Sequence, residues 1–318
     1  MTVAGQDSSL PGLNIVVVCY NCGGDILQLV DDIRGGDYPL HRLSLTIVDN
    51  ASADDSMELL RTIDGVACRV IEAGRNLGFG AGCNLAVRHI ADKAPILFLN
   101  PDVRLRPDSL SELMHGRRQQ PLAGIWGGIT CDAHGAPDGN SAWREPSLRG
   151  LIAWSFFIDA LLRPAGFSGT ESYAPSQLRQ GGAVDAISGC FFLIDWDLFQ
   201  RLGGFDEQFF LYSEEIDLCR RARLLGAQPW VIPRARVTHA GSVTLSSESK
   251  LRHLYYSKLL YYRKYWSPLG FKVARLLLSA GALLRLAALS LLAPLRREFK
   301  LRRKNWWNFF KQQLSWKF

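Results

Sequence analysis

The stretch "ILFLNPDVRL" (Ile96–Leu105) decides the fold of this 318-residue chain. Its four leading apolar residues predict a buried strand that runs directly into Asn100, Pro101 and Asp102. Asn-Pro-Asp is a favourable turn sequence, so one interpretation is that Asp102 only begins the next helix. The alternative is that the carboxylate serves as a ligand for a hard divalent cation, which prefers oxygen ligands, at the mouth of a ligand crevice.

Short apolar runs alternate with amphipathic stretches from Leu13 onward, the pattern of repeated strand-helix-strand units. This predicts an α/β fold with a mostly parallel central sheet flanked by helices. The predicted strands are Asn14–Cys19, Ser44–Val48, Ala67–Glu72 and Pro95–Leu99, and the predicted helices between them include Ile26–Ile33 and Asp55–Ile63.

Small or polar residues follow each of these predicted strands. The carboxyl ends of the strands in an open parallel sheet border the ligand crevice, so we expect the four polar ends to converge on one site. The candidate residues at this site are Tyr20, Asn21, Asp49, Asn50, Ser52, Arg75, Asn76 and Asn100.

The glycine run "NLGFGAGCN" (Asn76–Asn84) places its glycines at alternate positions. It matches neither the dinucleotide-binding nor the P-loop spacing, so a dinucleotide-binding fold is poorly supported. We interpret the glycines, Gly80 among them, as letting the backbone pass close to a ligand before the helix that carries Asn84. A plain tight loop is the open alternative.

The densest acidic cluster is Ser213-Glu214-Glu215-Ile216-Asp217. Ser213 could cap a helix ending near Gly226, with acids in its first turn. The preceding aromatic run, Phe209–Tyr212, favours catalysis instead, because an apolar wall raises a carboxylate pKa toward that of a useful base. His239 follows a predicted strand, Pro229–Ile232, and is either structural or a partner of a metal or diphosphate near Asp102.

Charge separates the end of the chain from the rest. The whole chain carries +7, whereas residues 251–318 contain 15 Lys and Arg against one acid, a net +14, which leaves −7 for the remainder. Such a basic, Trp-rich end suits nucleic acid or an anionic membrane surface. The seven cysteines are odd in number and form no dense framework, which favours reduced cytosolic thiols. Cys19 and Cys22 match C-x-x-C without a second pair, so a redox or zinc role is not favoured, and residues 1–12 show no secretory signal.

The apolar segment Ala274–Leu295 is long enough to span a bilayer, but Arg285 interrupts it near its middle. The following residues 296–318 interleave bases with Trp and Phe, as in elements that lie at an anionic membrane interface. The long Leu/Ala segment favours lipid over nucleic acid. We therefore expect no nucleic-acid partner and a peripheral tail, while a spanning hairpin stays open.

Six motifs in order resemble glycosyltransferase family 2, and in particular its rhamnosyltransferase branch. They are "VVVCYN", "IVDNASADDS", "NLGFGAGCN", "LFLNPDV", "GGFDEQFFLYSEEIDLCRRA" and "VTHAGSVT", spread over about Leu13–Trp266. The resemblance implies a GT-A fold and sugar transfer with inversion. With the GT-A domain expected over 13–250, divided into a nucleotide-sugar half (13–128) and an acceptor half (129–250), the remaining parts would be a flexible 1–12 and, by its composition, a helical membrane-associating tail over 251–318.

The resemblance also implies roles for individual residues. Asp49 would bind a pyrimidine base, with Asn76 beside the nucleoside, and Asp102, aided by His239, would hold Mg²⁺ or Mn²⁺ against the diphosphate. Glu215 would be the general base, and Glu214 is the alternative candidate for this role. Two departures from the family pattern are Asn100 at the first metal-motif position and Glu-Glu in place of Glu-Asp. The acceptor side would include Asp206, Asp217 and Trp126.

The function implied is transfer of a sugar, with L-rhamnose from dTDP-L-rhamnose as the best candidate and a UDP-sugar as the other donor class. The acceptor would be a glycan or polyprenyl-linked hydroxyl used in bacterial envelope synthesis at the cytoplasmic face of the inner membrane. Two alternatives stay open: a sugar nucleotidyltransferase, whose usual basic residue is missing from "VVVCYNCGG", and a non-catalytic membrane-bound glycan-binding protein.

Overall fold

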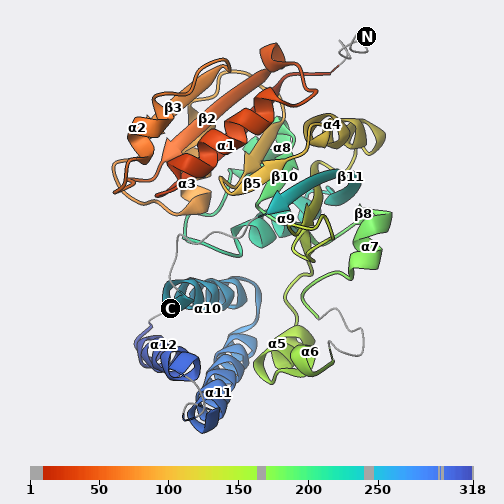
Figure 1. Cartoon of the computed structure of the whole chain (residues 1–318). Coiled ribbons are helices and arrows are strands. Elements are labelled where there is room, and N and C mark those ends of the chain that lie inside the picture. Colours follow the sequence, from red (N-terminus) through yellow and green to blue (C-terminus); the bar gives the residue numbers. More distant parts are fainter. Residues whose placement is uncertain (1–9, 163–169, 240–246, 293, 295–296, 317–318) are drawn as a thin grey trace. The chain divides into compact units, whose positions relative to one another are not determined.

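Strands and helices alternate along the chain as the sequence pattern predicts (Figure 1). The structure is a computed structural model that describes residues 10–162, 170–239, 247–292, 294 and 297–316. The strands are β1 Leu13–Cys19, β2 Leu43–Asp49, β3 Cys68–Glu72, β4 Ile96–Leu99, β5 Val103–Leu105, β6 Ile125–Cys131, β7 Ala142–Trp143, β8 Gly182–Ala183, β9 Ala186–Ile187, β10 Phe191–Ile194 and β11 Trp230–His239.

The helices include one short 3₁₀ helix, η1, at Leu40–Arg42. The α-helices are α1 Gly23–Arg34, α2 Ser56–Leu60, α3 Phe79–Arg88, α4 Ser109–Gln119, α5 Leu148–Ser155, α6 Ile158–Leu162, α7 Pro175–Gln180, α8 Trp196–Leu202, α9 Glu214–Leu224, α10 Ser247–Tyr265, α11 Pro268–Leu292 and α12 Arg297–Leu314.

The central sheet has the strand order β3-β2-β1-β4-β10-β6-β11-β5, with β8 added beside β11. Strands β3, β2, β1 and β4 are parallel to one another, as expected. β10 runs antiparallel to both of its neighbours, and β11 is parallel to β6 but antiparallel to β5. The α/β fold class is therefore confirmed, while the sheet is mixed, because an apolar run such as Phe191–Ile194 does not encode the direction of its strand.

Both faces of the sheet are covered by helices, since side chains alternate between faces along each strand. Ile15 and Val17 of β1 pack in one buried cluster with residues of α1 and α4. Val16 of the same strand packs in a second cluster with residues of α3, α8 and α9. The strand ends are thus left as the open edge between two helical layers.

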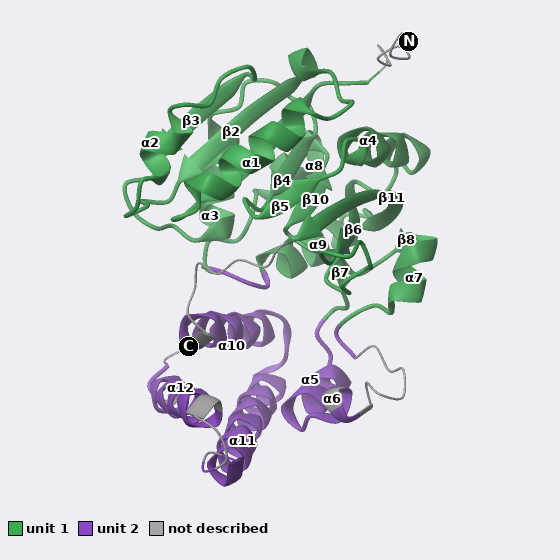
Figure 2. Cartoon of the chain, in the orientation of Figure 1, with its two compact units in different colours: residues 1–145, 172–210, 214–244 green, residues 146–171, 211–213, 245–318 purple. Residues whose placement is uncertain are grey.

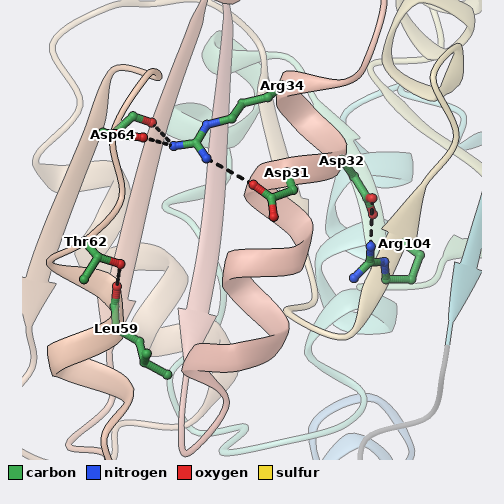
Figure 3. A network of polar contacts seen from close by, with 7 residues as sticks. All are labelled: Asp31, Asp32, Arg34, Leu59, Thr62, Asp64 and Arg104. Atoms are coloured by element: carbon green, nitrogen blue, oxygen red, sulfur yellow. Dashed lines mark hydrogen bonds and ion pairs between the residues drawn. The ribbon is translucent and has the colours of Figure 1, made fainter.

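Helix α1 fixes the position of β5, the strand that follows Asp102 (Figure 3). Arg104 of β5 forms an ion pair with Asp32 of α1 at 2.9 Å. The other oxygen of Asp32 accepts a hydrogen bond from the backbone N–H of Leu105 at 3.0 Å. Exposed ion pairs contribute little stability by themselves. Together with the backbone bond, however, this pair holds the chain just after Asp102 in one register.

The chain divides into two compact units, coloured separately in Figure 2. Residues 1–9 of the expected flexible N-terminus lie outside the described residues. Leu10 is buried, and the carbonyl of Pro11 accepts a hydrogen bond from the Tyr38 hydroxyl at 2.6 Å, so the ordered chain begins before residue 13. Unit 1 comprises 1–145, 172–210 and 214–244, and unit 2 comprises 146–171, 211–213 and 245–318.

Unit 2 joins the C-terminal helices to α5 and α6 from the middle of the chain, a combination that the expected boundary at 250 did not include. Among the described helices, α11 is long and apolar enough to cross a membrane. Arg285 of α11 donates to the carbonyls of Trp154 at 2.7 Å and Ser155 at 3.0 Å. Its guanidinium also lies over the ring of Phe157 at 4.2 Å. The arginine that interrupts the apolar segment is therefore held inside unit 2.

Candidate active site

The ends of β1 and β2 form a loop pair with one unsatisfied carboxylate oxygen. Asp49 is buried, and one of its oxygens accepts the N–H of Ser52 at 3.1 Å. Its other oxygen is buried without a hydrogen-bond partner among the described residues. Burial of an unpaired acceptor costs free energy, so this oxygen is suited to a donor group on a ligand.

Asn21 builds this loop pair. It adopts a left-handed conformation (φ 54°), its N–H donates to the Ser52 hydroxyl at 2.9 Å, and its side-chain oxygen accepts the N–H of Ala53 at 2.7 Å. These bonds tie β1 to β2 just beside Asp49. The amide of neighbouring Asn50 donates to the carbonyl of Gly78 at 2.9 Å, which ties the loop to the glycine run.

Asp102 and His239 meet at the end of β4. His239 is the last residue of β11 and not, as predicted, a residue after a shorter strand. The register of β11 against β5 pairs it with Val103, so it lies next to Asp102, with 3.4 Å between His239 Nε2 and Asp102 Oδ1. Both carboxylate oxygens of Asp102 are buried without a hydrogen-bond partner among the described residues.

The acidic pair begins helix α9 after a strained approach. Tyr212 and Ser213 both have φ 70°, a left-handed conformation that non-glycine residues rarely adopt and that often occurs at functional sites. An N-cap residue normally has extended dihedrals, so Ser213 does not fit the capping alternative well. Glu214 is buried and Glu215 is half-buried.

Two hydrogen bonds hold this approach in place. The carbonyl of Phe210 accepts the N–H of Phe79 at 3.0 Å, within unit 1. The carbonyl of Leu211 accepts the hydroxyl of Ser257, a buried residue of α10, at 2.7 Å, within unit 2. The backbone leading to the acids is therefore fixed on both sides of the Phe210–Leu211 peptide.

Burial raises the pKa of Glu214 well above its ordinary value, and the negative charge of Glu215 raises it further. The surroundings of Glu214 therefore favour its protonated form. Glu215 lies beside the turn between β9 and β10, where a Cβ added to Gly189 would be 4.0 Å from the Cβ of Glu215. Glu215, the less buried acid, is the better candidate for contact with a ligand.

The glycine run packs closely against the segment that carries the acids. A Cβ on Gly80 would lie 3.0 Å from the Cβ of Phe205 and 3.6 Å from that of Glu214. A Cβ on Gly78 would clash with the carbonyl oxygen of Phe210. The missing side chains thus let α3 approach this segment, and the ligand-binding role expected for Gly80 stays a prediction.

Two further predictions need correction, and a third residue, Asn84, expected at the donor site, has a structural contact. The amide of Asn84 donates to the carbonyl of Phe205 at 2.9 Å and accepts the N–H of the same residue at 2.9 Å, and its ligand role stays a prediction. Trp126 is fully buried in β6 and cannot contact an acceptor. Asp217 is also fully buried, paired with Arg221 at 2.8 Å, and that arginine donates to the carbonyl of Gly204.

The other predicted residues lie at the expected edge without a contact that defines their role. Asn76 closes its own turn by accepting the N–H of Gly78 at 3.0 Å, and Arg75 is exposed. Asp206 accepts the N–H of Gln208 at 3.0 Å and shapes the turn before the aromatic run. The ligand roles of these residues, and of Tyr20 and Asn100, stay predictions.

Asp25 and Asp138 belong to the same region although the sequence did not identify them. Burial raises the pKa of Asp25, and the charge of Asp102 raises it further, which puts the first turn of α1 close to the metal candidate. The pKa of Cys190 is raised to about 12, mainly by burial and in part by Asp138, Asp102 and Glu215. An acid in a first helical turn is ordinary, so sequence offered no signal for Asp25.

Asp102 and His239 are suitable ligands for a divalent cation. A buried carboxylate with both oxygens unpaired, next to an imidazole nitrogen, matches the ligand types that Mg²⁺ and Mn²⁺ accept. No group of three His, Cys, Asp or Glu side chains gathers as a metal site within the described parts of the chain. Asp102 and His239 are thus the two candidate ligands that the described residues offer.

Comparison with known proteins agrees with this geometry. The model of the family "Glycosyl transferase family 2" matches residues 14–175. The N-acetylglucosaminyl-diphospho-decaprenol L-rhamnosyltransferase of Mycobacterium tuberculosis is 30% identical over 71% of this chain and 75% of its own length. The rhamnosyltransferase WbbL of Escherichia coli is 27% identical over 71% of this chain and 82% of its own.

The mannosyltransferase PcManGT of Pyrobaculum calidifontis, solved with GDP-Man and Mn²⁺, has a similar structure. It superposes with a TM-score of 0.59 at 17% identity, over 96% of this chain and 87% of its own, which supports the fold. This chain belongs to glycosyltransferase family 2 and is a glycosyltransferase with the GT-A fold.

Proposed function

We propose that the chain transfers L-rhamnose from dTDP-L-rhamnose to a hydroxyl of a lipid-linked acceptor, with inversion at the anomeric carbon, in envelope glycan synthesis. The observation that carries the proposal is Asp102. Its two oxygens are buried without a hydrogen-bond partner among the described residues, and one of them lies 3.4 Å from His239 Nε2 at the end of β4. A UDP-sugar is the alternative donor, since uracil and thymine differ only in a methyl group.

Asp49 binds the base of the donor. Its buried, unpaired oxygen is an acceptor for the N3–H of a pyrimidine, and its other oxygen is held by the N–H of Ser52. The Asn21 bonds keep this carboxylate at the sheet edge. A cytosine has no N3–H, so a carboxylate here favours thymine or uracil.

Glu215 is the general base. It takes the proton of the acceptor hydroxyl as that oxygen attacks the anomeric carbon, and the bond from this carbon to the diphosphate oxygen breaks. The electron pair leaves with the nucleoside diphosphate on the opposite face, which inverts the configuration. Glu214 is less suited to take this proton, because it is buried whereas Glu215 is half-buried.

Asp102 and His239 would hold Mg²⁺ or Mn²⁺ next to the donor diphosphate. When bound, such a cation supplies positive charge that stabilises the leaving diphosphate. Asn100 stands where the family has its first metal-motif acid, which leaves Asp102 as the single carboxylate ligand of this motif. Binding that depends on one carboxylate and on phosphate oxygens predicts a site that accepts either ion.

Unit 2 lies on the cytoplasmic face of the inner membrane. Leucines of α11 at positions 269, 276, 283 and 291 are between 48% and 81% exposed, a stripe suited to the acyl region of a bilayer. Arg285 is turned inward and bound by backbone carbonyls, so it does not interrupt this stripe. The bilayer would supply the lipid-linked acceptor.

The test is donor binding and hydrolysis over a panel of nucleotide sugars, with and without Mg²⁺ or Mn²⁺. We expect dTDP-L-rhamnose to bind best, metal to strengthen its binding, and slow hydrolysis to disappear in Glu215→Gln while binding is kept. The matched control is Glu207→Gln, an exposed acid of unit 1 outside the proposed site.

Each alternative gives a different result. Binding of nucleotide sugars without hydrolysis or transfer in the wild type would indicate a non-catalytic binding protein. Release of pyrophosphate from a nucleoside triphosphate and a sugar phosphate would indicate a nucleotidyltransferase. If no nucleotide sugar binds under any metal condition, the roles of Asp49, Asp102 and Glu215 fall together.

A further inference from the structure

Helices α11 and α12 line an open pocket within unit 2. Its volume is about 560 Å³, and its walls combine apolar side chains with two cations. Leu286 is buried at its floor, and Leu283 and Trp307 are about half exposed at its rim. The lining residues are Leu283, Leu286, Ala287, Ser290, Arg303, Lys304 and Trp307.

The charged side of the pocket comes from α12. Arg303 and Lys304 are exposed, and neither forms an ion pair with another described residue. Lys311 brings a third cation, 5.9 Å from the centre of the Trp307 ring. Between Phe299 and Gln313 the sequence has five Lys and Arg and no acid. An unbalanced cluster next to an open pocket favours an anionic ligand.

The apolar side of the pocket continues along α11. Leu276, Leu283 and Leu291 are 69%, 48% and 81% exposed, and their spacing of seven or eight residues keeps them on one side of the helix. An apolar stripe that ends beside a basic, Trp-containing pocket matches the two ends of a phospholipid. Trp is the aromatic residue typical of the boundary between headgroups and acyl chains.

We propose that this pocket binds the headgroup phosphate of an anionic membrane phospholipid. Arg303 and Lys304 contact the phosphate, Trp307 lies at the level of the headgroup, and an acyl chain lies along Leu283 and its neighbours in the stripe. A free phosphate ion would use only the basic half of this site. The proposal rests on the membrane association of unit 2 proposed above. It adds that this association depends on one specific lipid site.

The experiment measures binding of the full chain to vesicles of phosphatidylcholine, with or without phosphatidylglycerol. The test variant is R303Q/K304Q. The matched control is R263Q/K264Q, which removes an adjacent exposed arginine and lysine of α10 away from the pocket. If the attraction were only diffuse, both variants would lose the same affinity, since each basic residue near an anionic surface contributes a similar amount. We expect the test variant to lose about tenfold more affinity for the anionic vesicles.

A second arm uses soluble short-chain phosphatidylglycerol and inorganic phosphate. The wild type should bind the lipid with one-site saturation, and phosphate should compete only weakly. Equal losses in both variants, equal binding to both kinds of vesicle, or phosphate binding as tight as lipid binding would each overturn the proposal. Tighter one-site binding of a polyprenyl diphosphate sugar than of phosphatidylglycerol would also overturn it, because the pocket would then bind the acceptor.

Hydrolysis of the nucleotide sugar in vesicle-free buffer separates this proposal from the proposed function. Both double variants should keep the wild-type rate, which also reports that unit 1 is folded. If the wild type hydrolyses no nucleotide sugar but binds anionic lipid through Arg303 and Lys304, the lipid site stands and the donor site does not.

Discussion

The two units place apolar side chains in opposite ways. In the described part of unit 1, three large apolar residues are exposed, namely Leu122, Leu224 and Leu225, whereas unit 2 exposes fourteen although it is less than half as long. A soluble surface scatters such residues singly, and a concentration of them marks a face that meets another apolar phase. Among the described residues, unit 1 thus scatters its few exposed apolar side chains, and unit 2 concentrates them.

Arg285 of unit 2 and two buried acids of unit 1 differ in whether hydrogen-bond partners satisfy them. Arg285 of unit 2 is satisfied by backbone carbonyls and aromatic rings, which identifies a structural charge. Asp102 and Glu214 of unit 1 keep buried oxygens without hydrogen-bond partners among the described residues. Buried polar groups are normally paired, so unpaired ones indicate a missing ligand or a functional proton. Asp102 and Glu214 are therefore candidate functional groups of unit 1, and Arg285 is a structural charge of unit 2.

The largest expected effect is that of Glu215→Gln. General-base catalysis contributes about 100-fold to 10,000-fold, so turnover should fall by that factor while vesicle binding is unchanged. Steady-state transfer assays and vesicle sedimentation on the same preparation measure the two properties. A loss of vesicle binding together with activity would show that the roles of the two units are not separate.

Asp102→Ala should weaken donor binding in the presence of Mg²⁺ or Mn²⁺ by about 10-fold to 100-fold, the range for lost metal-site groups. Calorimetric titration with the donor, with metal and with a chelator, measures this effect. The control is Asp197→Ala, an exposed acid in the first turn of α8. An equal loss in the chelated sample would mean that Asp102 does not act through a cation.

Arg285→Met tests the structural charge of unit 2. Losing its hydrogen bonds should reduce the local free energy of unfolding by about 1.5 to 3 kcal/mol, the range for hydrogen bonds to charged groups. Faster amide hydrogen exchange in α5 and α11 would report this, while nucleotide-sugar hydrolysis stays unchanged. Arg263→Met, an exposed arginine of α10, serves as control. Unchanged exchange would contradict the structural assignment.

Ser257→Ala should have a smaller effect on catalysis. It removes the hydrogen bond to Leu211, which precedes the strained residues before Glu214. One hydrogen bond contributes about 1 kcal/mol, so we expect turnover to fall about fivefold with an unchanged KM for the donor. A changed KM and unchanged kcat would show that α10 does not position the acids.

The smallest effect is a gain of stability in Glu214→Gln. In the folded protein Glu214 keeps its proton to a pH well above 4.5, its ordinary pKa, whereas the unfolded chain loses it near that pH. Ionisation of the unfolded state therefore lowers wild-type stability as pH rises. The wild type and the variant should have matching midpoints of thermal unfolding near pH 4.5. At pH 8 the midpoint of the variant should be a few degrees higher than that of the wild type. A constant difference would contradict the raised pKa.

Sequence predicts the parallel half of the sheet well. The strands expected at 14–19, 44–48, 67–72 and 95–99 appear within a residue or two of their bounds, because β-branched and apolar runs are strong local signals. The edge at which Asp49 and Asp102 lie follows from those strands and the crossover rule. These parts depend on local pattern and simple topology.

The contacts that the sequence does not predict are distant ones. Gly80 packs against Phe205 and Glu214, and Asn84 forms hydrogen bonds with Phe205, more than 100 residues later in the chain. Trp126 lies on the side of β6 that faces the core, and the local sequence of β6 does not predict which side that is. The assembly of α5 with α11 likewise joins segments whose pairing no local pattern predicts.

The most direct test of the account is transfer from dTDP-L-rhamnose to an N-acetylglucosaminyl diphospho-polyprenol in anionic vesicles, followed by mass spectrometry. The account predicts an acceptor extended by one deoxyhexose with the wild type and R285M, and almost none with E215Q. Equal product from E215Q, or no product from any nucleotide sugar with the wild type, would contradict it.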